Sequence, residues 1–159
     1  MAREIGSWLS GPEPVNPGDT ADWPGRTLGL PESGPRSLAR SGRRFLALLI
    51  DWFVAVGLTG LLPAFGLLPG NLLQTSEGQT VILGIWFVLG VLSVRLFGFT
   101  PGQYALGLMV IPVDNRQHVG SGRAIGRGLL LSLVIPGLFT DADGRGLQDR
   151  LTGTAVVRR

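Results

Sequence analysis

The stretch over residues 43–62, RRFLALLIDWFVAVGLTGLL, decides the fold of this chain. Two arginines are followed by eighteen residues, of which only Asp51 can carry a charge. An α-helix over these eighteen residues is about 27 Å long, close to the hydrocarbon thickness of a bilayer. The stretch therefore predicts a membrane-spanning helix over about residues 43–62, ended by Pro63.

A second apolar run over residues 81–97, VILGIWFVLGVLSVRLF, predicts a second spanning helix over about residues 79–97. Several arginines precede residue 45, whereas residues 63–80 contain a single charge, Glu77. By the positive-inside rule the amino terminus faces the cytoplasm and residues 63–80 lie outside. We expect a multi-pass protein of the plasma (inner) membrane.

A third apolar helix is expected over about residues 122–139, followed by a tail over residues 140–159. A full crossing would put the four arginines of the tail outside, which the positive-inside rule opposes. An in-plane or re-entrant helix that returns to the cytoplasm is therefore equally compatible with the sequence, and we expect a cytoplasmic carboxyl terminus. Residues around Pro112 suggest an extended segment along the membrane surface, and residues 154–157 a short strand.

Residues 1–40 have a different composition from residues 41–159, because they contain six prolines and few apolar side chains. Such a segment buries too little apolar surface to offset the entropy of ordering it, so we expect a disordered cytoplasmic arm. Its isolated aromatic and leucine residues either dock a partner protein or rest on the membrane surface. The candidate docking residues are Trp8, Trp23, Leu28 and Leu30.

The composition excludes several classes of function. The chain has no Cys and a single His, His118, so disulfides, thiolate nucleophiles and zinc–thiolate sites are ruled out. No nucleophile–base pair, metal cluster or phosphate-binding loop is visible, so we expect neither an enzyme nor a cofactor. Residues 41–159 contain ten Arg against six acidic residues, a balance that suits anionic lipid head groups in a bilayer and not nucleic acid.

Asp51 needs a partner, because an unpaired carboxylate in a membrane helix costs several kcal/mol. Its neighbours one helical turn away are apolar, and Arg44 lies about 10 Å along the axis with its side chain directed away. We therefore expect Asp51 to meet Arg95 or Arg127 from another helix, which leaves Arg44 to hold Asp149 at the cytoplasmic surface. A proton or cation site, and a protonated Asp51 bonded to backbone, remain alternatives.

The charged residues and the tail motif GLQDRLTGTAVV over residues 146–157 resemble those of the RDD family of small membrane proteins, of a bacterial, actinobacterial type. Arg44, Asp51 and Asp149 would be the three residues that name the family, and residues 100–103, Gly107 and Arg127 are similar to further family positions. Gln148 stands where the family usually has His. The resemblance, over about residues 40–159, implies a polytopic membrane protein for which transport, including sodium–proton exchange, has been proposed.

These observations together predict an all-α integral membrane protein with two spanning helices, a third apolar helix and a disordered arm. We expect a non-catalytic accessory or assembly subunit of a larger plasma-membrane complex. The alternative is an oligomeric ion- or proton-coupled transporter that uses Asp51, since two or three helices are too few to enclose a path in one chain.

Overall fold

The computed structural model describes residues 23–114, 118–133 and 145–159. Two helices dominate it, α1 (Ser41–Leu61) and α2 (Ser76–Phe97), and both are long and apolar enough to cross a membrane. Short 3-10 turns η2 (Leu62–Phe65) and η3 (Leu72–Gln74) connect them, and η1 (Arg26–Leu28) precedes them. The remaining elements are α3 (Pro101–Ala105), β1 (Leu108–Pro112), α4 (Ser121–Ser132), α6 (Leu147–Leu151) and β2 (Thr154–Arg158).

Helix α1 has one narrow buried face, formed by residues spaced four apart: Ala47, Asp51, Ala55 and Thr59. Several of its large side chains point away from the protein, and Phe53, for example, is 70% exposed. Residues four apart lie on one face of a helix, so the small and polar residues of α1 are the ones that other elements approach. An apolar face left uncovered over this length suits contact with lipid.

Helix α2 lies beside α1, and specific residues cap both of its ends. The Thr75 side chain accepts a hydrogen bond from the Gly78 N–H at 3.1 Å, which caps the amino terminus. Gly98 ends the helix in the left-handed conformation, at φ 76°. The Trp52 and Trp86 rings meet edge to face with centroids 6.4 Å apart, so the two helices are in contact at mid-length.

A small antiparallel sheet corrects the expected all-α fold. β1 pairs with β2 in a register that joins Leu108 to Arg158 and Pro112 to Thr154. Both extended segments were expected, but their pairing was not, because the two strands lie more than 40 residues apart. Leu108 and Val110 are buried in the core, so one face of β1 packs against the rest of the chain.

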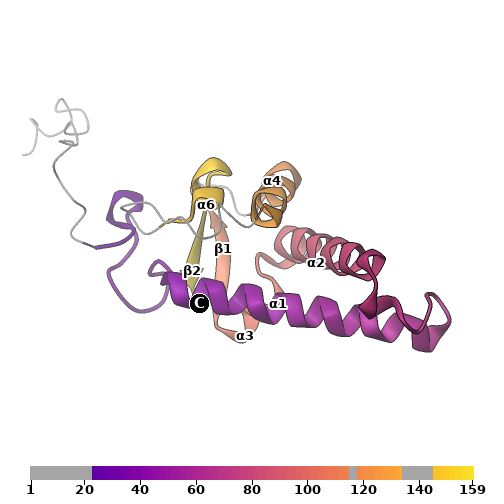
Figure 1. Ribbon diagram of the computed structural model, residues 1–159. Coiled ribbons are helices and arrows are strands. Elements are labelled where there is room, and N and C mark those ends of the chain that lie inside the picture. The colour runs from indigo at the N-terminus through magenta and orange to yellow at the C-terminus, as the bar shows by residue number, and fades with distance from the viewer. Residues whose placement is uncertain (1–22, 115–117, 134–144) are drawn as a thin grey trace, which may run out of the picture.

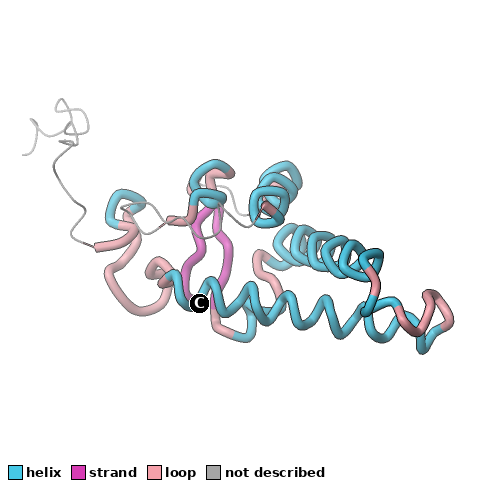
Figure 2. Tube along the Cα trace, in the orientation of Figure 1, coloured by secondary structure: helices cyan, strands magenta, loops and turns pink. Residues whose placement is uncertain are grey.

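The last residues of the predicted arm belong to the folded unit, so the boundary at residue 40 is wrong. The Ser37 carbonyl accepts a hydrogen bond from the Arg158 N–H, and the Ala39 N–H donates to the Val156 carbonyl, both at 2.9 Å. Residues 36–39 thereby cover the outer edge of β2, which would otherwise present unpaired backbone groups. We call residues 36–39, α3, β1, α6 and β2 the cap (Figure 2).

The candidate docking residues of the arm are partly held within the chain. The Trp23 indole N–H donates to the Leu30 carbonyl at 3.1 Å, and Trp23, Leu28 and Leu30 are each half-buried. Trp8 lies outside the described residues. A role of these residues in docking a partner stays a prediction.

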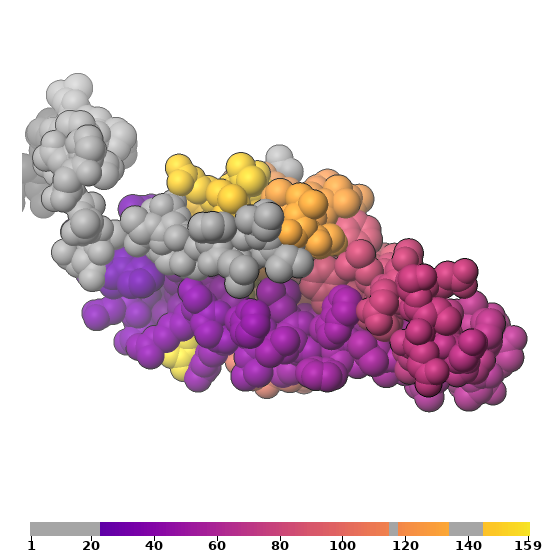
Figure 3. All heavy atoms as spheres, in the orientation of Figure 1, coloured from indigo at the N-terminus to yellow at the C-terminus, as the bar shows by residue number. Residues whose placement is uncertain are grey.

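The core lies where the cap meets the ends of the two long helices, and α1 and α2 extend beyond it (Figure 1). In Figure 3 the atoms of α4 and α6 gather over one end of α1, while the turn between α1 and α2 projects from the other. Helix α4 corresponds to the third apolar helix, but it ends at Ser132, and residues 134–139 of the predicted helix lie outside the described residues. Its twelve residues span about 18 Å, too short for a crossing.

Candidate functional site: a buried charged network

Asp51 is bound by the start of α3. The sequence had led us to expect Arg95 or Arg127, but neither forms an ion pair with Asp51, although Arg127 is near enough for its charge to act on the carboxylate. The Thr100 hydroxyl donates to one carboxylate oxygen at 2.6 Å, and the Gly102 N–H donates to the other at 2.7 Å. Asp51 is 5% exposed. The prediction favoured arginine partners over backbone, whereas a hydroxyl and a backbone N–H satisfy a carboxylate equally well.

The sequence around Thr100 explains why α3 begins at this point. The Thr100 hydroxyl accepts from the Gln103 N–H at 3.2 Å, and the Gln103 side chain accepts from the Thr100 N–H at 3.0 Å. This reciprocal pair is a capping box, and Pro101 occupies the first helical position, where no N–H is needed. The T-x-x-Q pattern was the sequence signal that could have identified Thr100 as a functional position.

Gly102 allows α3 to approach α1 closely. A Cβ at this position would lie 2.1 Å from the Ala47 carbonyl oxygen and 3.1 Å from the Asp51 carboxyl carbon. No side chain fits that space, so the backbone of Gly102 lies directly on the small-residue face of α1. The approach brings the Gly102 N–H within hydrogen-bond distance of Asp51.

Asp149, in α6, is the centre of a second group of charges. It is fully buried and forms ion pairs with Arg44 of α1, at 3.1 Å, and with Arg127 of α4. The expected pair between Arg44 and Asp149 is present. Arg127 also forms an ion pair, but with Asp149, since α6 packs against α4.

Further bonds connect this ion-pair group to β2. The second Arg44 nitrogen donates to the Val156 carbonyl at 3.3 Å, and the Thr154 hydroxyl lies 3.5 Å from Asp149. The Arg145 guanidinium donates to the Thr154 carbonyl at 2.9 Å. One buried carboxylate therefore holds α1, α4, α6 and β2 together.

Arg95 does not join the network. Its Nε donates to the Ser121 hydroxyl at 3.0 Å, at an exposed position where the end of α2 meets the start of α4. Gln148 is buried next to Asp149, and its side-chain oxygen has no hydrogen-bond partner among the described residues.

The RDD family model matches residues 38–153, which include Arg44, Asp51 and Asp149. The chain belongs to the RDD family. Comparison with curated proteins and with solved structures finds no match. The family resemblance deduced from the sequence is thus confirmed. In this RDD protein, the two acidic family positions occupy separate sites, one on α1 against α3 and the other in α6 against two arginines.

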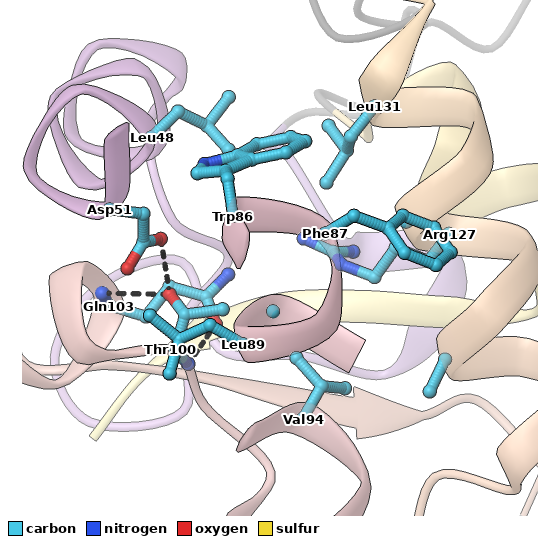
Figure 4. A pocket seen from close by; sticks show the side chains of 13 residues that line it. Leu48, Asp51, Trp86, Phe87, Leu89, Val94, Thr100, Gln103, Arg127 and Leu131 are labelled. Atoms are coloured by element: carbon cyan, nitrogen blue, oxygen red, sulfur yellow. Dashed lines mark hydrogen bonds between the residues drawn. The ribbon is translucent and has the colours of Figure 1, made fainter. Parts of the chain in front are cut away.

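A small cavity adjoins Asp51 in the RDD domain (Figure 4). Its volume is about 30 Å³, room for one or two water molecules. Polar groups of Asp51, Thr100, Gln103 and Arg127 line one part of it, and apolar side chains, including Trp86, line the rest. Among the described residues no group of acidic or His side chains could hold a metal ion. The cavity is too small for an organic substrate.

Replacing Asp51 with asparagine is expected to destabilise the protein by about 1–3 kcal/mol, because one amide group must face two hydrogen-bond donors. The loss should appear as a lower thermal unfolding midpoint in detergent. Thr59→Val is the matched control, since Thr59 lies on the same buried face of α1 and its hydroxyl bonds only to the Ala55 carbonyl of its own helix. An equal loss in both variants would contradict a specific role for the α3 contacts.

Proposed function

We propose that this RDD protein is a non-catalytic integral membrane protein that acts as an accessory or assembly subunit of a larger plasma-membrane complex. The observation that carries the proposal is that both buried carboxylates of the network are bonded within the chain. Asp51 holds α3 on α1, and Asp149 holds α6 against Arg44 and Arg127. A network of this kind stabilises a shape and leaves neither of these two carboxylates free to react with a substrate.

The outer faces of the helices support the same proposal. Phe53 on α1 and Leu92 on α2 are 70% and 52% exposed, and other large apolar side chains of both helices are similarly uncovered. Two helices alone cannot cover each other in a membrane, so lipid or the helices of another protein must cover them. The cap is on the cytoplasmic side in this proposal, as the arginines near the start of α1 indicate.

The test is affinity isolation of the tagged full-length protein from its native membrane in a mild detergent, followed by mass spectrometry. We expect stable co-purification with a larger membrane complex. Phe53→Ala and Leu92→Ala should weaken it if the outer helix faces bind the partner, whereas Phe65→Ala, in the exposed turn η2, should not. Isolation as a lone homo-oligomer would count against an accessory role.

An oligomeric ion- or proton-coupled transporter is the second candidate, because the cavity beside the Asp51 carboxylate is large enough for a water molecule. Purified protein in liposomes with an internal pH dye would then show cation-driven proton flux. Asp51→Asn should abolish the flux, and Thr59→Val should leave it unchanged. The absence of flux from correctly folded protein would reject this candidate. Arg127 lines the same cavity, and its positive charge disfavours a bound cation there.

A further inference from the structure

We propose that α4 is a half-depth re-entrant helix, whose exposed apolar face contacts lipid acyl chains in the leaflet on the cap side. The sequence left three paths open for this helix: a full crossing, an in-plane helix and a re-entrant one. The contacts of α4 favour the third, and the inference does not depend on the function proposed above.

Helix α4 runs antiparallel beside α2 toward its apolar middle. Its first residue, Ser121, accepts a hydrogen bond from Arg95 near the end of α2. Seven residues later, Gly128 lies against Phe87 and Val91, where a Cβ would approach both side chains to 2.9 Å. The two contacts are about 10 Å apart along α4 and about 9 Å apart along α2. An in-plane helix would cross α2 at one level and could not make both contacts.

The uncovered face of α4 becomes more exposed with distance from Ser121. Ile125, Leu129 and Leu133 are four residues apart, so they lie on one face, and they are 44%, 55% and 65% exposed. Apolar side chains arranged in this way are stable in hydrocarbon and costly in water. The partner of this face is therefore apolar along its whole length.

The chain is on the same face of the membrane before and after α4. Ser121 lies at the cap-side end of α2, through its bond from Arg95. By residue 145 the chain is again in the cap, where Arg145 donates to the Thr154 carbonyl and Asp149 pairs with Arg44 near the start of α1. A single full crossing between residues 121 and 145 would separate these two points by the membrane thickness. The two described points lie on one face, so α4 is not part of a single full crossing.

Lipid is the occupant that the surroundings of α4 favour. Gly128 packs against Phe87, and the next residue of α2, Val88, is 52% exposed, so the spanning helix also presents apolar surface near this level. At the opposite end, Arg123 and Asp114 form an exposed ion pair that suits water and head groups. From the start of α4 to its end the exposed side chains therefore change from charged to apolar, as expected for a helix that runs from the head groups toward the middle of the bilayer.

Single-cysteine variants test the proposal directly, because the full-length protein has no Cys. Leu129→Cys and Leu133→Cys probe the apolar face, and Gly122→Cys is the matched control on the same helix, at an exposed position with open space around a Cβ. In liposomes we expect loss of labelling by a membrane-impermeant maleimide at positions 129 and 133 from both sides, and full labelling at 122. Monodisperse elution in detergent verifies that each variant is folded.

Depth and sidedness complete the experiment. A fluorophore attached through Leu133→Cys should be quenched by spin-labelled lipid as strongly as one attached through Val88→Cys. Leu151→Cys should be labelled from the same side as Gly122→Cys, and Asn71→Cys from the opposite side. Three outcomes would each overturn the proposal. Leu133→Cys could be labelled from water, it could be protected from labelling without being quenched by lipid, or Leu151→Cys could be labelled from the same side as Asn71→Cys. Protection without quenching would mean that protein, not lipid, covers α4.

Discussion

Replacing Asp149 with asparagine is expected to destabilise the protein by about 3–5 kcal/mol, the loss that follows when one partner of a buried ion pair is removed. The Arg44 and Arg127 guanidinium groups would then lie close together without a counter-charge, and their side chains are 10% and 6% exposed. We expect a large fall in the thermal unfolding midpoint in detergent. Limited proteolysis should cut the cap early, because Asp149 joins α6 to both α1 and α4.

The exposed ion pair between Arg123 and Asp114 provides the control for this loss. Its side chains are 27% and 45% exposed, so Asp114→Asn should leave the unfolding midpoint unchanged. Replacing Arg44, Arg127 and Asp149 together by apolar residues of similar size should recover part of the loss seen in Asp149→Asn, since the two arginines would no longer lie buried without a counter-charge. Similar midpoints for Asp149→Asn and Asp114→Asn would show that the buried network does not hold the cap in place.

Replacing Gly102 with alanine is expected to cost about 3 kcal/mol or more, at the upper end of overpacking losses. The added methyl group would meet the Ala47 carbonyl oxygen, which belongs to the backbone of a helix and cannot rotate away. Relief requires α3 to move off α1, and that movement would also break the bond between the Gly102 N–H and Asp51. The unfolding midpoint should therefore fall further than in Asp51→Asn, where α3 keeps its position.

Gly122→Ala is the matched control for this substitution. Gly122 is also in a helix, α4, but a Cβ there meets no atom within 4 Å. Alanine should be neutral or stabilise the protein by up to about 1 kcal/mol, because it reduces the freedom of the unfolded chain. A comparable loss in the Gly122 and Gly102 variants would mean that helix propensity, and not the contact with Ala47, controls both.

The spanning helices could be predicted from the sequence because their signal is local. Apolar runs of about twenty residues, with charges only at particular places, predict α1 and α2 within a few residues of their observed bounds. The RDD tail motif is also contiguous in the sequence. The family resemblance singled out its Asp149, and helix geometry left Arg44 available as its partner. The small sheet could not be predicted, because five-residue strands separated by more than 40 residues leave no joint pattern in one sequence.

The partner of Asp51 could not be predicted for a different reason. Helix geometry established only that the carboxylate needs a bond from another element. Which element approaches depends on how closely two backbones can pack. Gly102 permits a contact that no charged side chain makes, so a backbone N–H and a hydroxyl took the place of the expected arginine.

The sequence by itself thus determined the family, the two long helices and the need for each buried charge to be paired. Those properties follow from local composition and from the cost of placing a charge in an apolar medium. Only the tertiary structure decided which groups hold Asp51, that residues 36–39 complete the sheet, and that α4 lies along α2. These outcomes depend on contacts between residues far apart in the chain, where steric fit and backbone hydrogen bonds choose among partners that the sequence leaves equivalent.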